Sequence, residues 1–345
     1  MRPVRVLIVD DSMFIRRTLA AIVKGDPQLD VAGLASDGVQ AVEMAAELKP
    51  DIITMDINMP KMNGLEALKI IMEKSPTAVL MVSQHTEEGA QATMEALSTG
   101  AMDFVTKSGG DSAVGLISLK KKLLVKIKEL TQTEPAERSE ITEAQMPDKP
   151  GHPVEMVAIG LSTGGPRALQ ELMANLPENF PAGGVIIQHI PATFIKSFAE
   201  RLNMVSKVAV KIAENGEPVQ TGIFLVAPGH THLKFRHGPG PKPQISTWLD
   251  PQPMNSMHRP SVDQTLLSLA DAYPRRGLGV IMTGMGQDGL IGARAMKEKG
   301  CTIVTQDKKS SVVYGMPRAV MEDGLAVAAL PIRLLSEYII LSVNQ

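Results

Sequence analysis

Short runs of apolar residues alternate along the chain with longer stretches in which apolar residues recur every three or four positions. The first part of the chain has such runs at residues 6–9, 31–34, 52–55, 79–82 and 104–105. Buried parallel strands are short continuous apolar runs, and the helices that connect them carry the longer period. The alternation therefore predicts an N-terminal α/β domain with a five-strand parallel, doubly wound, flavodoxin-like sheet.

The last helical stretch of this part, about residues 116–130, predicts an amphipathic helix. Its apolar face is made of Leu116, Leu119, Leu123, Ile127 and Leu130. Lysines at positions 120, 121, 122, 126 and 128 mostly fall on the other faces, so we expect them to be solvated. Residues 131–153 contain no periodic apolar residues. A segment of this composition buries too little apolar surface to offset the entropy that it would lose on becoming ordered. We therefore predict a domain at 1–130, a linker at 131–153 and a second domain at 154–345.

The alternation of strands and helices resumes after the predicted linker. Apolar runs lie at residues 156–159, 185–187, 208–212, 223–226, 278–282 and 301–304. Residues 233–249 suggest additional β-structure, and Gly238-Pro239-Gly240-Pro241 predicts a hairpin-like loop within it. We expect a second doubly wound α/β domain that carries a β-hairpin excursion.

Composition and charge limit the class of protein. The 345-residue chain is long enough for two domains with separate cores. Its formal net charge is −2, and no basic stretch is interleaved with aromatic residues, so nucleic acid is not an expected partner. No apolar run approaches the roughly 20 residues that span a bilayer, and the chain enters its first strand without room for a signal peptide. We expect a cytoplasmic protein without membrane insertion, and the single cysteine, Cys301, fits a reducing compartment.

Polar residues follow the predicted strands of the first domain. Asp10 and Asp11 follow the first strand, Asp56 the third, Ser83 the fourth and Lys107 the fifth. The carboxyl ends of parallel strands meet at one edge of the sheet, so these side chains should converge there. Carboxylates that lie close together repel one another unless a bound cation neutralises their charge. Carboxylate oxygens are ligands that Mg²⁺ prefers. We predict that Asp56 accepts a phosphoryl group and that Asp10, Asp11 and Asp56 hold Mg²⁺. Ser83 and Lys107 would contact the phosphoryl oxygens; alternatively, the acids only cap helices.

A serine lies between a strand and a helix in the second domain. The sequence Gly160-Leu161-Ser162-Thr163-Gly164 separates the run at 156–159 from a helical stretch at 166–175. Glycines on both sides permit a strained turn that lifts the hydroxyl out of the sheet and leaves backbone N–H groups free for an oxyanion. This pattern predicts a nucleophilic serine in an acyl-transfer or ester-cleaving enzyme. The alternative is a tight structural turn or a phosphate-binding loop.

Two further strand ends supply partners for Ser162. His189 follows the run at 185–187, and Asp288 lies in the loop 283–289 that follows the run at 278–282. We expect His189 to act as the base and Asp288 to orient it and stabilise its imidazolium. The Met285 N–H is expected to face the oxyanion. In the alternative interpretations, His189 is a core or loop residue and the loop 283–289 binds a nucleotide or a metal.

Residues 1 to about 130 resemble a response-regulator receiver domain. The resemblance depends on Asp10-Asp11, Asp56, Met59-Pro60, Asn63-Gly64, Ser83 and Lys107. One departure is Ser108, which follows Lys107 where the family usually has proline. The cis peptide bond that the family's proline forms helps to direct the lysine side chain, so this replacement affects the local orientation of Lys107. The resemblance implies phosphorylation of Asp56 with Mg²⁺.

Residues 155–335 resemble the methylesterase domain of the chemotaxis protein-glutamate methylesterase family. The motifs that carry this resemblance are 159–165, Gln188-His189-Ile190-Pro191, Ala227-Pro228-Gly229-His230, 258–263, 283–289 and Tyr314-Gly315-Met316-Pro317. The resemblance implies hydrolysis of glutamyl methyl esters on methylated chemoreceptors, release of methanol and deamidation of receptor glutamines, with no cofactor for the esterase reaction. It further implies a chemotaxis histidine kinase as phosphodonor, and we expect the unphosphorylated receiver to cover the Ser162 pocket.

Two other classes of protein remain possible at this level. A response regulator whose second domain only binds a partner would use the serine turn as structure or as an anion nest. A regulator acting on DNA would need a helix-turn-helix and a basic face after residue 150, and neither is visible.

Overall fold

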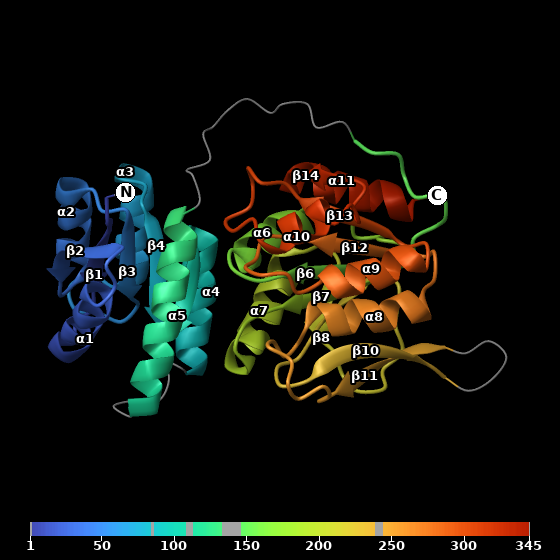
Figure 1. Cartoon of the computed structure of the whole chain (residues 1–345), viewed down its shortest axis with the longest axis horizontal. Coiled ribbons are helices and arrows are strands. Elements are labelled where there is room, and N and C mark those ends of the chain that lie inside the picture. The colour runs from blue at the N-terminus through green and yellow to red at the C-terminus, as the bar shows by residue number, and fades with distance from the viewer. Residues whose placement is uncertain (1, 84–85, 108–112, 133–145, 239–243, 345) are drawn as a thin grey trace. The chain divides into compact units, whose positions relative to one another are not determined.

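The computed structural model describes residues 2–83, 86–107, 113–132, 146–238 and 244–344. Contacts between Cα atoms divide the chain into two compact units, residues 1–135 and 136–345 (Figure 1). Ser108, whose place after Lys107 differs from the receiver pattern, lies outside the described residues, and so does most of the predicted loop 238–241.

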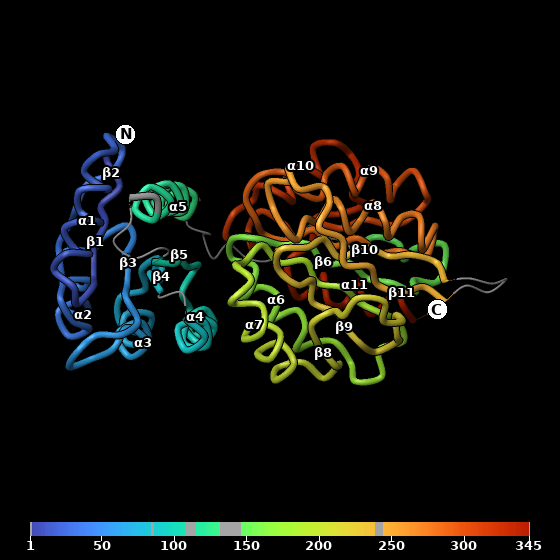
Figure 2. The backbone as a smooth tube through the Cα atoms, turned by 90° about the horizontal axis from the view of Figure 1, so that it is seen from below, coloured from blue at the N-terminus to red at the C-terminus, as the bar shows by residue number. Residues whose placement is uncertain are grey.

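The first unit has a five-stranded parallel sheet in the order β2-β1-β3-β4-β5, as predicted. Its strands are β1 (Val4–Val9), β2 (Leu29–Ala35), β3 (Ile52–Asp56), β4 (Ala78–Ser83) and β5 (Asp103–Thr106). Its helices are α1 (Met13–Lys24), α2 (Gly38–Leu48), α3 (Gly64–Lys74), α4 (Glu87–Thr99) and α5 (Ala113–Gln132). Figure 2 shows α4 and α5 on opposite sides of β5, so helices cover both faces of the sheet.

Local signals fix where the helices of this unit begin. The Ser12 side chain accepts a hydrogen bond from the Ile15 N–H at the start of α1. Asn63 and Glu66 form a reciprocal capping box at the start of α3. These side chains satisfy backbone donors that the first turn of a helix leaves free. The caps therefore set the first residue of α1, which follows β1 after three residues, and of α3, which follows β3 after a loop.

The expectation for the lysines of α5 is only partly correct. Leu119, Leu123, Ile127 and Leu130 are buried, as the amphipathic pattern predicts, and the lysines at 120–122 are exposed. Lys126, however, pairs with the buried Asp103, and Lys128 Nζ lies 2.6 Å from Asp26 Oδ2. Long lysine side chains extend beyond the helix surface, so these two reach acids in other parts of the unit. The sequence of α5 alone does not show these acids.

The second unit has a seven-stranded parallel sheet in the order β14-β13-β12-β6-β7-β9-β8. Its strands are β6 (Met156–Leu161), β7 (Gly183–Gln188), β8 (Ala209–Ile212), β9 (Ile223–Val226), β12 (Gly277–Ile281), β13 (Thr302–Gln306) and β14 (Ala329–Leu330). Its helices are α6 (Gly165–Ala174), α7 (Ala192–Val205), α8 (Val262–Ala272), α9 (Leu290–Glu298), α10 (Met316–Glu322) and α11 (Ile332–Val343). The short β14 has no counterpart among the predicted strands. The chain leaves β6 toward β7 on one side and later fills the other side with β12, so the switch point of the sheet lies beside β6.

The predicted hairpin is confirmed as a separate antiparallel pair, β10 (His232–His237) and β11 (Ile245–Asp250). It packs on α8, as Figure 1 shows. Leu233 and Phe235 of β10 are buried in the same core as Leu266 and Leu269 of α8. The hairpin therefore covers the outer face of α8 and fixes the chain that enters this helix.

Within the described ranges, every helix is too short or too polar to cross a membrane.

Candidate functional site

Ser162 and His189 leave the second unit's sheet side by side. Ser162 follows β6 and His189 follows β7, and in this parallel pair Leu161 lies opposite Gln188. The His189 N–H donates to the Leu161 carbonyl at 3.1 Å. The two residues thus lie at the carboxyl edge next to the switch point, where open α/β sheets place their ligands.

The backbone around Ser162 is held from several sides. Its N–H donates to the Thr283 carbonyl at 3.0 Å, and its own carbonyl accepts the Gly165 N–H at 2.9 Å. The Gln188 side-chain Nε2 donates to the same carbonyl at 2.9 Å. Gly164, two residues after Ser162, has φ +77°, and Ser162 is not among the described non-glycine residues with positive φ. The left-handed conformation of the turn thus falls on one of the two flanking glycines, as expected, because glycine adopts it without the steric cost of a Cβ.

His189 and Asp288 form a hydrogen-bonded pair. His189 Nε2 lies 2.8 Å from Asp288 Oδ2, although the residues are 99 positions apart. Since a carboxylate only accepts, a neutral His189 ring carries its proton on Nε2 and keeps a lone pair on Nδ1. Nδ1 is buried and has no hydrogen-bond partner among the described residues, so the Ser162 hydroxyl is not bonded to it in this state. Hydrogen bonds of this kind are often long without substrate and tighten when it binds.

Asp288 lies against the N-terminus of α8. Its carboxylate accepts the Ser261 hydroxyl at 2.9 Å, the Val262 N–H at 2.8 Å and the Asp263 N–H at 2.9 Å. Burial by itself would raise the pKa of Asp288, but the hydrogen bond and charge of His189 and these backbone donors hold it well below its ordinary value. Asp288 is therefore a fixed negative charge behind the His189 ring.

The loop that contains Met285 passes directly against Ser162. A Cβ placed on Gly284 would lie 2.8 Å from the Ser162 Cβ, so only glycine permits this approach. The Gly284 N–H donates to the Val313 carbonyl at 3.0 Å, and the Gly284 carbonyl accepts the Met316 N–H at 2.9 Å. Backbone bonds thus hold the loop at Gly284, and the Met285 amide is the next one along the chain.

The first unit brings its predicted polar residues to one sheet edge. Asp10, Asp11 and Asp56 each offer a carboxylate oxygen, and these oxygens all lie within 4.8 Å of one another. Lys107 Nζ lies 2.7 Å from Asp10 Oδ2 and 2.8 Å from Asp56 Oδ2. Burial raises the pKa of Asp56 despite the opposing lysine, while the two acids raise the pKa of Lys107 against the effect of its own burial. Three converging oxygen donors are a suitable ligand set for Mg²⁺, so the residues fit this ion.

Ser83 lies at the same edge but is bonded toward α4. The Thr93 hydroxyl donates to Ser83 Oγ at 2.8 Å, and Ser83 Oγ lies 3.2 Å from the Gly89 carbonyl. Ser83 is buried. A change of partner at this hydroxyl would therefore act directly on the first turns of α4.

Both units of the chain match the models of known protein families. The family model described as CheB methylesterase matches residues 157–339, more than half of the chain and every strand end around Ser162. The chain belongs to the CheB methylesterase family. The model of the response regulator receiver domain matches residues 6–114, which contain the acidic cluster and Lys107.

Individual relatives agree along the full length. A protein of Thermotoga maritima named protein-glutamate methylesterase/protein-glutamine glutaminase is 45% identical, over 96% of this chain and 96% of its own. A protein of Pyrococcus abyssi with the same name is 40% identical, over 100% of this chain and 95% of its own. The crystal structure of the Thermotoga maritima CheB methylesterase catalytic domain is 42% identical and has a TM-score of 0.52, covering 55% of this chain and 98% of its own. The identity with the two curated relatives therefore spans both α/β units of this chain.

Sequence reasoning assigned no role to several residues that surround the CheB site. Ser261, Asp263 and His258 all come from the segment that enters α8, and Gln188 ends β7. All four lie within the family motifs 188–191 and 258–263, and Ser261 stands directly before a helical stretch and is hence a typical N-cap. These signals mark a site and a helix start, but they do not predict which carboxylate the helix faces.

Asp263 is a second buried carboxyl group beside Asp288. Its Oδ1 accepts the Gly289 N–H at 2.9 Å and the Gly292 N–H at 2.8 Å, and so ties α8 to the start of α9. Burial and, after it, the charge of Asp288 raise the pKa of Asp263 to about 6, although the hydrogen bond from Gly292 opposes this. The pKa of Asp263 is therefore raised and that of its neighbour Asp288 is lowered.

We expect Asp263→Asn to stabilise the protein more at pH 7 than at pH 4. Between about pH 4 and 6 the folded wild type keeps a proton on Asp263 that the unfolded chain has lost, so its stability falls as the pH rises through this window. Asparagine keeps the acceptor oxygen and does not ionise. A pKa shift of one unit is worth about 1.4 kcal/mol, which corresponds to a change in melting temperature of roughly 3–6 °C for a domain of this size.

Thermal unfolding of the full-length variant and wild type at both pH values measures this difference. The pKa of His258 is lowered to about 4, so His258 contributes a slope of opposite sign, but it is present in both proteins and cancels in the comparison. An equal difference in melting temperature at pH 4 and pH 7 would contradict the prediction.

Proposed function

We propose that this chain hydrolyses glutamyl methyl esters on methylated chemoreceptors, giving a carboxylate and methanol, and that it deamidates receptor glutamines at the same site. The names of its full-length relatives support both activities. The observation that carries the proposal is the 2.8 Å bond between His189 Nε2 and Asp288 Oδ2, which leaves Nδ1 as the free acceptor beside Ser162. This arrangement suits a serine nucleophile with a histidine base.

In the proposed reaction, the Ser162 hydroxyl attacks the ester carbonyl while His189 Nδ1 takes its proton. Asp288 stabilises the imidazolium, and the Met285 N–H donates to the oxyanion of the tetrahedral intermediate. His189 then gives the proton to the departing methanol, and Ser162 holds the glutamyl group as an ester. Water repeats the cycle on this acyl-enzyme and restores the serine. With a glutamine substrate the same steps release ammonia. The esterase steps use no cofactor.

The receiver is proposed to control this reaction through phosphorylation of Asp56. Asp10, Asp11 and Asp56 would hold Mg²⁺, which supplies positive charge next to the phosphoryl oxygens. Lys107 lies between Asp10 and Asp56 and is able to contact those oxygens, and Ser83 would exchange its contacts at α4 for the phosphoryl group. A phosphoryl group adds about two negative charges and so favours a different receiver conformation.

The same proposal covers the setting of the protein. We assign residues 1–130 to the receiver, 131–153 to a linker and 154–345 to the catalytic domain. A chemotaxis histidine kinase would be the phosphodonor, methylated chemoreceptors would be the substrates, and the cytoplasm would be the compartment in which both are met.

The test is methanol release from methylated receptor membranes, with and without acetyl phosphate and Mg²⁺. We expect release by the wild type to rise with the phosphodonor. Asp56→Asn should keep the basal rate and lose the stimulation, because it removes the phosphoryl acceptor and changes no catalytic residue. A stoichiometric complex with receptors and no methanol would instead indicate a binding module.

A further inference from the structure

The His258 ring lies flat on the His189 ring. The ring centroids are 3.9 Å apart and the planes differ by 9°. His258 comes from the segment between β11 and α8, far from β7 in the sequence. One whole face of the His189 imidazole is therefore covered by a second imidazole.

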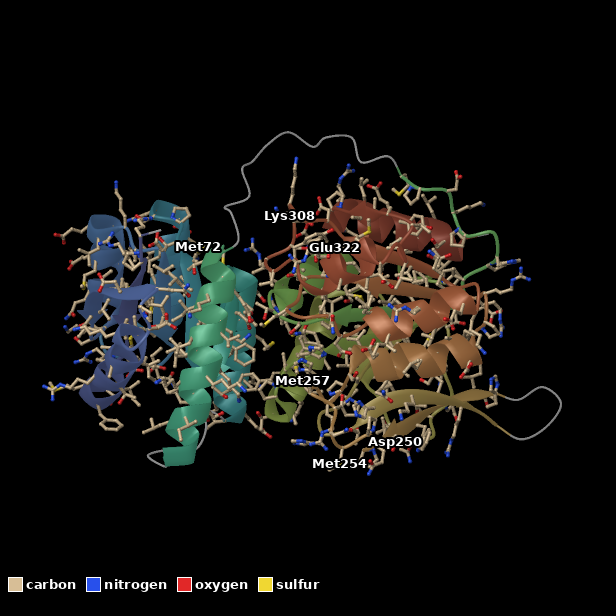
Figure 3. The ribbon with its side chains drawn as sticks, in the orientation of Figure 1. Met72, Asp250, Met254, Met257, Lys308 and Glu322 are labelled. Carbon is tan, nitrogen blue, oxygen red and sulfur yellow. The ribbon has the colours of Figure 1, made fainter. Side chains whose placement is uncertain are left out.

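The segment that carries His258 is anchored at the site. Three residues on, the Ser261 N–H donates to His232 Nδ1 at 3.2 Å, and the Ser261 hydroxyl donates to Asp288 at 2.9 Å. Met257 is 91% exposed, whereas His258 is half-buried, so the chain turns His258 inward at this point. Met254 and Met257, which Figure 3 labels, are both exposed to solvent. The same short stretch thus supplies a donor to Asp288 and a ring to His189.

The charge of His258 suits this place. The charged or titratable groups that act on it are His189 and Asp288, and burial together with His189 lowers its pKa to about 4. His258 is therefore neutral at neutral pH and does not repel an imidazolium that forms beneath it.

The contact supplies what the hydrogen bonds of His189 leave undetermined. The bond from Nε2 to Asp288 fixes one point of the ring but permits rotation of the ring plane about the direction of that bond. Nδ1 has no hydrogen-bond partner among the described residues, so no second bond prevents this rotation. A flat group in contact with the ring face does prevent it, and thereby decides where Nδ1 lies.

We propose that His258 is a positioning residue: its ring fixes the plane of the His189 ring, so that Nδ1 is held for the proton of the Ser162 hydroxyl. The inference rests on the proposed function, and it concerns the shape of the His258 ring rather than its nitrogens.

The experiment compares His258→Leu and His258→Phe in the full-length protein, with His237→Leu on the exposed end of β10 as control. Misplacement of a reacting group by about 1 Å costs up to roughly a hundredfold, so we expect His258→Leu to lower kcat by about ten- to a hundredfold with KM unchanged. His258→Phe should recover kcat to within about threefold, since it restores a flat ring of similar size. The control should match the wild type.

A second readout does not depend on turnover. In ¹⁵N-histidine spectra, with His189 assigned by its loss in His189→Gln, the wild type and His258→Phe should show one tautomer with its proton on Nε2. His258→Leu should show averaged or broadened His189 signals. An undiminished kcat or an unchanged His189 spectrum in His258→Leu overturns the inference, and so does a His258→Phe variant as impaired as His258→Leu. If the wild type releases no methanol while the spectra still separate the two variants as expected, the proposed function fails and the positioning contact stands.

Discussion

Ser162→Ala should abolish methanol release, with kcat reduced by a factor on the order of 10⁵ to 10⁶. The substitution removes the atom that attacks the ester, and no other group of the site replaces a covalent intermediate. The hydrogen bonds of Ser162 to Thr283 and Gly165 are made by its backbone and persist in alanine. We therefore expect the variant to fold normally and to accept a phosphoryl group on Asp56.

The measurement is single-turnover and steady-state methanol release, with the melting temperature and phosphorylation of Asp56 as checks on folding. Ser206→Ala is the matched control, because this hydroxyl is buried at the end of α7 and has no partner among the described residues. It should keep the wild-type rate. If Ser162→Ala releases methanol within tenfold of the wild type, the serine is not the nucleophile.

Asp288→Asn should lower both activity and stability. An amide at this place cannot stabilise the imidazolium and favours the wrong tautomer of His189, and a loss of about 10⁴ in kcat is typical of such a change. The amide also replaces a charge that accepts from Ser261, Val262 and Asp263 at the N-terminus of α8. Hydrogen bonds to charged groups are worth roughly 1.5–3 kcal/mol each, so a clear fall in melting temperature should accompany the loss of activity.

The pH dependence of this stability loss has a defined sign. The pKa of Asp288 is depressed in the folded state, so its contribution is present at neutral pH and is lost only in acid, beginning below about pH 4. The destabilisation by Asp288→Asn should thus be large at pH 7 and shrink toward pH 3. Asp323→Asn, which removes an exposed ion pair with Arg294, should change little at any pH. A loss of activity in Asp288→Asn without any loss of stability would contradict the role assigned to its backbone contacts.

The sequence predicted the fold of both units because their signals are local. Apolar runs bounded by turn residues mark buried strands, and the three-to-four-residue period marks helices, whatever the rest of the chain does. The same locality explains why Asp56, Ser162 and His189 were candidates: Asp56 ends a strand, Ser162 and His189 each directly follow one, and the strand ends of a parallel sheet share an edge. Only β14, with two residues, was too short to give such a signal.

The surroundings of the site could not be predicted in this way. His258 reaches His189, and Ser261 reaches Asp288, only because the β10–β11 hairpin and α8 pack together and direct the intervening segment to the sheet edge. The pairing of Lys126 and Lys128 with acids outside α5 has the same origin. Contacts between residues far apart in the chain produce no periodic pattern in the sequence, so the pattern cannot predict them.

The amino-acid sequence by itself determined two α/β units, all their strands except β14, the hairpin and the polar residues at the strand ends of the sites, because hydrophobic period and turn chemistry act over a few residues. Only the tertiary structure decided that His189 Nε2 meets Asp288, that Gly164 takes the left-handed conformation of the serine turn, and that His258 covers the His189 ring. Those features depend on how separate elements pack against one another. In a close-packed interior the position of a side chain is set by the atoms around it, and most of these come from parts of the chain that are distant in sequence.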